Sequence, residues 1–129
     1  MAAAVGVAGL DQREVRQVFH LGDAVLQTVA DRLKENTRDD DTVSRIGGDE
    51  FLVLVMGVRD KQSVSHLAQK IASHIQAPCQ LFVGQVSIKL SIGIARFPQD
   101  GDSAEALVKQ ADTAMYKAKH EGAAYGFAS

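Results

Sequence analysis

Two acidic residues, Asp49 and Glu50, directly follow two glycines, Gly47 and Gly48. Glycine has no side chain, so a pair of glycines lets a ligand approach the backbone closely. Carboxylate oxygens are the ligands that hard cations such as Mg²⁺ take, and a cation held there could bind phosphate groups. An ordinary hairpin with polar residues at its tip is the plain alternative. These four residues alone leave both interpretations open.

A second charged group lies upstream, at residues 38–41, and reads Arg-Asp-Asp-Asp. Five residues separate Asp41 from Gly47. The Arg38 guanidinium could form paired hydrogen bonds with a phosphate or stack on a base, and the Asp41 carboxylate could accept hydrogen bonds from a base edge. A solvated acidic loop after a helix is the alternative interpretation.

Three stretches of the chain predict helices, because apolar residues recur in them at steps of three and four. These stretches are residues 18–33, 64–75 and 107–118. We expect Asp102 or Ser103 to be the N-cap of the third helix and Gly122 to end it. All three helices would have one apolar face to bury.

Two β-prone segments, residues 42–46 and 51–56, flank Gly47 and Gly48 and predict a hairpin. Residues 51–56 are all apolar, which is typical of a central strand with helices on both faces. A second hairpin is expected over residues 80–95, with its turn near Val83, Gly84 and Gln85. The order helix, hairpin, helix, hairpin, helix predicts an α/β fold, an α+β sandwich whose central, largely antiparallel sheet is flanked by helices.

The composition is that of one folded domain, which we expect to span residues 1–129. The net charge of -2 argues against general binding to nucleic acid. No apolar run approaches the ~20 residues that cross a bilayer, so direct membrane insertion is not expected. The first ten residues carry no Lys or Arg, unlike a signal peptide, and a single cysteine excludes an intrachain disulfide. We expect a cytoplasmic domain, which could also be the cytoplasmic part of a larger membrane-bound protein.

The signature of a known family is found at residues 47–51, which read Gly-Gly-Asp-Glu-Phe. The chain resembles the GGDEF family of diguanylate cyclases here and in three further segments. One reads Ser-Ile-Gly-Ile-Ala at 91–95, followed by Phe-Pro at 97–98 and Asp-Gly at 100–101. Another reads Ala-Asp-Thr-Ala-Met-Tyr-Lys-Ala-Lys at 111–119, and the last reads Leu-Gly-Asp at 21–23. The resemblance covers about residues 15–122 and implies a nucleotidyl-cyclase-like GGDEF fold.

The resemblance implies a reaction in which two molecules of GTP are joined into cyclic di-GMP. Each protomer of the family binds one GTP, and two protomers face each other, so a homodimer is needed for turnover. Each ribose 3′-hydroxyl attacks the α-phosphorus of the other GTP and releases pyrophosphate. Mg²⁺ or Mn²⁺ is the implied cofactor, because metal ions neutralise the charge that develops on the phosphates.

The resemblance also implies roles for individual residues. Gly47 and Gly48 match the glycines that lie against the nucleotide. Asp49 and Glu50 match the acidic pair that binds metal and activates the 3′-hydroxyl, with the division between the two left open.

Four further residues match functional positions of the family. Asp23 matches an aspartate that recognises guanine, and Lys119 matches a lysine that contacts the phosphates. Arg38 and Asp41 fit the RxxD pattern of an inhibitory site that binds cyclic di-GMP and blocks the enzyme through product feedback.

The chain departs from the family at its start, where the family's opening segment has no counterpart. In the family, the first core strand ends in Asp-x-Asp, whose first Asp is a metal ligand. Without gaps, Gly6 and Ala8 fall on these two positions; with three residues deleted, Gly9 and Asp11 do. The first metal ligand is therefore a glycine in either alignment. We also expect the loss of the opening strand to expose a sheet edge.

Two more family positions differ. The Asn that reads guanine falls on Glu14 in the gap-free alignment, and the Gly-Arg-Asn that follows Lys119 becomes Gly-Ala-Ala at 122–124, which removes a phosphate-binding Arg. These losses predict weak or absent cyclase activity. Natural degeneration and a truncated N-terminus are both left open as explanations.

Three functions follow from these observations. The first is a GGDEF-type diguanylate cyclase domain whose activity is impaired. The second is a degenerate GGDEF module that binds GTP or cyclic di-GMP and regulates a neighbouring domain, such as a fused sensor or an EAL phosphodiesterase. The third is a dimerisation module that binds no ligand.

Overall fold

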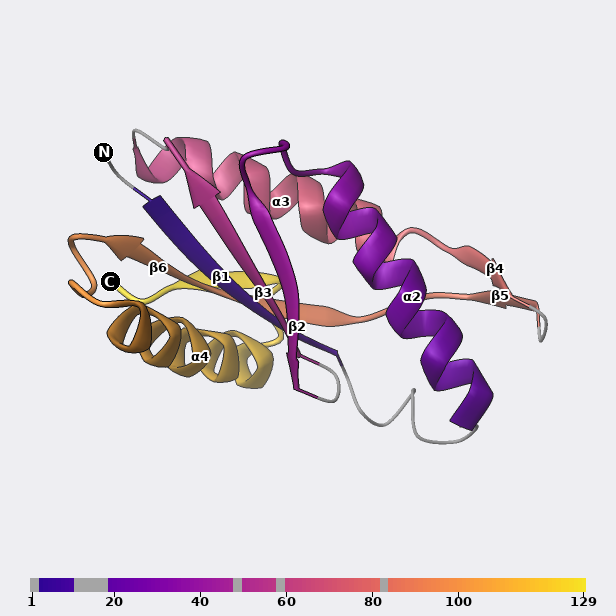
Figure 1. The fold of residues 1–129 in the computed structure, drawn as a ribbon. Helices are drawn as coiled ribbons and strands as arrows, with labels where there is room; N and C mark the ends of the chain where they lie inside the picture. The colour runs from indigo at the N-terminus through magenta and orange to yellow at the C-terminus, as the bar shows by residue number, and fades with distance from the viewer. Residues whose placement is uncertain (1–2, 11–18, 48–49, 58–59, 82–83) are drawn as a thin grey trace.

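The computed structural model describes residues 3–10, 19–47, 50–57, 60–81 and 84–129; for 3–10, 19–23, 46 and 47 it describes the backbone only. The helices there are α2 (Phe19–Glu35), α3 (Lys61–Gln76) and α4 (Ala104–Glu121). The strands there are β1 (Ala3–Leu10), β2 (Thr42–Gly47), β3 (Glu50–Met56), β4 (Cys79–Leu81), β5 (Gly84–Val86), β6 (Leu90–Phe97) and β7 (Tyr125–Phe127). Figure 1 shows how these elements are arranged.

The main sheet has five strands in the order β2-β3-β1-β6-β7. The pairs β2–β3, β3–β1 and β1–β6 are antiparallel, and β6–β7 is parallel. In Figure 1, α2 and α3 lie on one face of this sheet and α4 lies on the other. The predicted fold class, a largely antiparallel sheet flanked by helices, is confirmed.

The expectation that the opening strand is lost and a sheet edge exposed is wrong. Strand β1 lies in the middle of the sheet, where it pairs with both β3 and β6. Its sequence is rich in Ala and Gly, which have low β-propensity, so local preference does not reveal it. Pairing on both sides compensates for that weak preference.

The predicted hairpin over residues 80–95 is wrong in its pairing. Strand β4 pairs with β5 in a small separate sheet, and the predicted turn residue Val83 lies outside the described residues. Strand β6, in contrast, pairs with β1 and β7 of the main sheet. Partners far away in sequence therefore decide where this strand lies.

The third predicted helix begins and ends as expected. The Ser103 hydroxyl accepts a hydrogen bond from the Ala106 N–H at 3.1 Å and is the N-cap of α4. Gly122 ends the helix in the left-handed conformation, with φ of 70°. Among the described residues, no helix is both long and apolar enough to cross a membrane.

Two hydrophobic clusters flank the main sheet. The larger lies under α2 and α3 and includes the least exposed large side chains, Leu33, Ile75 and Val29. The smaller lies under α4 and is formed by Ala95, Leu107, Ala111 and Met115, with Leu52 and Leu54 packed against it. The sheet is thus covered on both faces.

Candidate functional site

Three residues on neighbouring strands lie in one line across the sheet. Gly9 of β1 pairs with Glu50 of β3 on one side and with Ser91 of β6 on the other. Neighbouring strands lie about 4.8 Å apart, so the backbones of Glu50 and Ser91 are roughly 10 Å apart. The position between them carries no side chain, because it is glycine.

This line faces α4. Alternate residues of a strand share a face, so Glu50 shares its face with Leu52 and Leu54, which pack against the α4 cluster. Ser91 likewise shares its face with Ala95, a member of the same cluster. Residues directly opposite one another in a sheet also share a face, so Gly9 lies on the α4 side as well.

The register of β1 distinguishes between the two alignments, which place either Gly6 or Gly9 at the position of the family's first metal ligand. Gly6 pairs with Val53 and with Ile94, both buried in the cluster under α2 and α3. A carboxylate at position 6 would face that apolar core, whereas one at position 9 would lie beside Glu50. The register therefore favours Gly9 as the counterpart of the family's first metal ligand.

Glu50 is half-buried at the start of β3 and lines a shallow groove against α4. The groove has a volume of about 530 Å³, and its charged members on α4 are Glu105, Lys109 and Asp112. Acidic side chains thus outnumber basic ones here.

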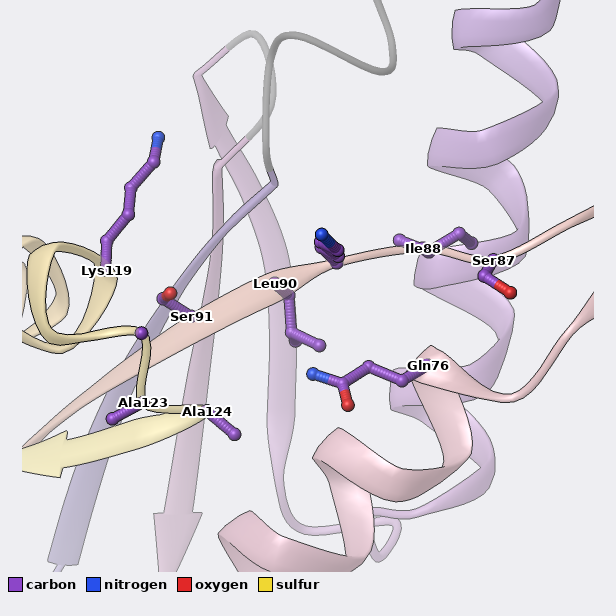
Figure 2. A pocket seen from close by; sticks show the side chains of 10 residues that line it. Gln76, Ser87, Ile88, Leu90, Ser91, Lys119, Ala123 and Ala124 are labelled. Atoms are coloured by element: carbon purple, nitrogen blue, oxygen red, sulfur yellow. The ribbon is translucent and has the colours of Figure 1, made fainter.

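Lys119 lines a second pocket, of about 600 Å³, at the C-terminal end of α4. Figure 2 shows Lys119 on the last turns of α4, Ser91 on β6 and Gln76 at the end of α3, gathered around this pocket. Lys89 and residues 122–124 complete much of its wall. Two basic side chains and a serine hydroxyl therefore border one cavity.

The other predicted residues of the nucleotide site are placed only in part. Gly47 ends β2 and pairs with Glu50, after a register shift between Arg45 and Gly47. Gly48 and Asp49 lie outside the described residues. Asp23 lies in α2, and its side chain is not described. Of the predicted set, the structure brings Glu50 and Lys119 to the α4 face of the sheet.

The Arg38–Asp41 loop forms a separate site between α2 and β2. Its pocket of about 340 Å³ is also lined by Val55 and Gly57, at the far end of β3 from Glu50. From Glu50 to Met56, β3 advances six residues at about 3.4 Å each, so the two ends of this strand, and the two sites, are roughly 20 Å apart. The two sets of residues therefore lie at opposite ends of β3, and their roles as sites stay predictions.

The Asp41 carboxylate holds its own loop together. One oxygen accepts a hydrogen bond from the Arg38 N–H at 2.9 Å, and the other accepts from the Met56 N–H at 3.4 Å. The Arg38 side chain is exposed. A carboxylate has about four acceptor positions, so these two bonds leave capacity for a ligand.

The pocket at the Arg38–Asp41 loop also contains Asp60, the N-cap of α3. The Asp60 carboxylate accepts a hydrogen bond from the Ser63 N–H at 2.7 Å. The Ser63 hydroxyl and its N–H hold the pKa of Asp60 below its ordinary value, because both stabilise the charged form.

The described residues do not fit a complete divalent metal site. Within them, no three or more His, Cys, Asp or Glu side chains gather closely enough to hold a metal ion. The position beside Glu50 on the neighbouring strand is Gly9, which offers no carboxylate. Hard divalent cations need several oxygen ligands, and the residues that the structure describes at this end of the sheet supply too few.

Sequence reasoning did not single out Lys89 or Ser91 as site residues. The available signal was alternation: Ile88, Leu90 and Ile92 are apolar and buried, so the residues between them lie on the opposite face. What could not be inferred was that this opposite face emerges beside the last turns of α4.

Comparison with known proteins agrees with the signature. The model of the family described as "Diguanylate cyclase, GGDEF domain" matches residues 19–124. MucR of Pseudomonas aeruginosa, a bifunctional diguanylate cyclase/cyclic di-GMP phosphodiesterase, is 45% identical over 103 residues, which are 80% of this chain and 15% of MucR. The diguanylate cyclase TpbB of the same species is 42% identical over 101 residues, or 78% of this chain and 23% of TpbB. The chain thus spans less than a quarter of the length of these relatives.

Solved structures give the same result for the fold. An EAL/GGDEF domain protein from M. capsulatus has a TM-score of 0.90 and 37% identity, over 99% of this chain and 85% of the other. The GGDEF domain of TpbB has a TM-score of 0.93 and 36% identity, over 99% and 83%. Gly47, Glu50 and Phe51 of the signature lie on the paired strands β2 and β3, and the family model matches most of the chain. The chain therefore belongs to the GGDEF domain family.

Proposed function

We propose that this chain is a GGDEF domain that binds GTP at the end of its sheet where Glu50, Gly9 and Ser91 lie in one line, but converts it to cyclic di-GMP weakly or not at all. In this proposal the carboxylates of Asp49 and Glu50 face the nucleotide, and Gly47 and Gly48 leave room for it. Asp23 accepts hydrogen bonds from guanine, and Lys119 contacts the phosphates. Turnover would require two such chains face to face.

The observation that carries the proposal is the register of β1. Gly9 lies directly opposite Glu50, at the position where a family member needs a carboxylate for its metal ion. Mg²⁺ and Mn²⁺ belong to the chemistry that the family generally uses, and they neutralise charge on the reacting phosphates. A donor set without that carboxylate supports binding of the nucleotide better than its turnover.

The test is incubation of the purified protein with GTP and Mg²⁺, followed by chromatography for cyclic di-GMP and pyrophosphate. We expect a folded sample to yield little or no product and to bind GTP in calorimetry. Glu50→Gln is the matched control, because it keeps the size of the side chain and removes its charge. Rapid product formation that disappears in Glu50→Gln would contradict the impairment.

A second function, binding of cyclic di-GMP as a regulatory signal, is supported by the pocket at the Arg38–Asp41 loop. The exposed Arg38 side chain and the Asp41 carboxylate line the same cavity, so one ligand could contact both. This site does not depend on Gly9, which lies at the other end of the sheet. An impaired cyclase domain could therefore still respond to the product and signal to a neighbouring EAL or sensor domain.

Calorimetry with cyclic di-GMP tests this second function. We expect binding by the original chain and a loss of roughly tenfold or more in Arg38→Ala, because a charged hydrogen bond contributes about 1.5–3 kcal/mol. Lys34→Ala, at an exposed position near the end of α2, is the control and should bind normally. Equal affinity in Arg38→Ala would exclude this loop as the binding site.

A further inference from the structure

The pocket beside Lys119 is open because small residues line one of its sides. Gly122, Ala123 and Ala124 follow α4 there, and the resemblance implies an arginine and an asparagine in place of the two alanines. Figure 2 shows the short side chains of Ala123 and Ala124 next to Ser91 and Lys119. The cavity therefore has room for a ligand group in the space that an Arg would occupy.

The segment that leads into β6 forms another wall of the pocket, and its burial pattern indicates where its side chains lie. Ile88 and Leu90 are 3% and 5% exposed and belong to the cluster under α2 and α3. Because successive side chains of an extended chain point to opposite faces, Lys89 lies on the α4 face together with Ser91. The buried neighbours thus hold Lys89 on the side where Lys119 also lies.

Charge and hydrogen-bonding groups in the pocket suit an anion. Lys89 and Lys119 are both exposed and line the same cavity, and none of the described residues that line it is acidic. Ser91 is only 8% exposed, and its side chain borders the cavity, so its hydroxyl can donate to a bound oxygen. A polyphosphate carries several negative charges and matches this set.

The lack of a carboxylate at Gly9 affects how phosphate charge near Glu50 can be neutralised. A bound metal ion normally offsets phosphate charge, but the strand position beside Glu50 offers no carboxylate to hold one. Two lysines supply positive charge directly and need no carboxylates. Between a metal and lysines as the source of positive charge, the described residues favour the lysines.

We propose that Lys89 acts with Lys119 as a second cationic contact for the polyphosphate of a guanine nucleotide, so that this chain binds GTP without a divalent metal. The inference rests on the proposed nucleotide binding and extends it to a residue outside the family signature. Ser91 contributes a hydrogen-bond donor in the same pocket.

Calorimetric titration of the full chain with GTP, in EDTA and in Mg²⁺, tests the inference. We expect affinities within about threefold in the two buffers and a loss of roughly tenfold in Lys89→Ala, since a factor of ten corresponds to about one charged hydrogen bond. Binding of GMP, which lacks the polyphosphate, should hardly change in Lys89→Ala. Lys70→Ala, an exposed lysine on α3, is the matched control and should bind GTP normally.

Distinct results would overturn distinct claims. GTP binding that is lost in EDTA would refute metal independence. Unchanged affinity in Lys89→Ala, with weaker binding in Lys119→Ala, would refute the role of Lys89 and leave the proposed nucleotide binding intact. A wild-type chain that is folded by circular dichroism but binds no GTP would refute both this inference and the proposed binding function.

Discussion

The two faces of the sheet are packed in different ways. Under α2 and α3, long apolar side chains such as Val29, Leu33 and Ile75 exclude water over a broad area. Under α4, the described cluster is smaller, and the helix approaches the strand backbone itself at Gly93. Both faces are covered, but the first relies on side-chain volume and the second on close approach.

This difference in packing suggests that one face of the sheet mainly stabilises the fold and that the other also provides a binding site. The α2/α3 face holds the strands together, and its described residues are mostly apolar. The α4 face is covered in the middle of β6 but opens at the start of the strand into the pocket of Lys119, which Ser91 and, just before the strand, Lys89 also line. We therefore expect substitutions in the covered parts to change stability, and substitutions at the uncovered end to change binding alone.

The largest stability effect is expected for Gly93→Ala. A Cβ at this position would lie 1.9 Å from the Ala111 carbonyl oxygen and 2.3 Å from the Met115 nitrogen, both in the backbone of α4. The helix would have to move, which we expect to lower the free energy of unfolding by about 3 kcal/mol or more. Urea denaturation measures this change.

Gly126→Ala provides the matched control, because Gly126 pairs with Gly93 in the sheet. Its added Cβ would lie 3.5 Å from the nearest side-chain atom, which is ordinary contact. We expect a change within about 1 kcal/mol there. Equal losses in the two variants would contradict the close approach of α4 to β6.

A smaller effect is expected on the other face for Arg32→Ala. The Arg32 guanidinium donates hydrogen bonds to carbonyl oxygens at the end of α3, those of His74 (2.9 Å), Ile75 (3.0 Å) and Ala77 (2.6 Å). Removing a charged donor from these carbonyls should lower the free energy of unfolding by about 2 kcal/mol. Arg32→Lys should recover part of the loss, and a thermal or urea melt that shows no difference would refute the link between α2 and α3.

The smallest effect is pH-dependent and concerns the N-cap of α3. Because Ser63 holds the pKa of Asp60 below 3.8, the ionised cap stabilises the fold fully above that pH. The contribution is lost as the pH falls through the lower pKa of the folded state. Unfolding curves of the original chain and Asp60→Asn should therefore differ by a constant amount at neutral pH and converge in strong acid. A difference that grows on acidification would contradict the sign.

The sequence predicted the helices and the first hairpin because their signals are local. Ser103 and Gly122 mark the ends of α4, and the unbroken apolar run at residues 51–56 marks strand β3. Strand β1 was not foreseen, since Ala and Gly give little local preference and its partners lie more than 40 residues away in sequence. The pairing of β6 was missed for the same reason.

The candidate site also has parts that the sequence predicted and parts that it did not. The signature at 47–51 and Lys119 could be recognised from residue type and spacing. Two questions needed the sheet register: whether Gly6 or Gly9 faces Glu50, and whether Lys89 shares a pocket with Lys119. Both are long-range relations, so no local pattern contains them.

The most direct test of the account is cyclic di-GMP formation by Gly9→Asp, with GTP and Mg²⁺ and with Gly6→Asp as the control. A carboxylate at position 9 would lie opposite Glu50, whereas one at position 6 would face the core. We predict a rise on the order of tenfold or more in Gly9→Asp, since metal sites respond this strongly to changes among their supporting groups, and no rise in Gly6→Asp. If the Gly9→Asp variant is folded but forms cyclic di-GMP no faster than the original chain, the claim that this glycine limits turnover is contradicted.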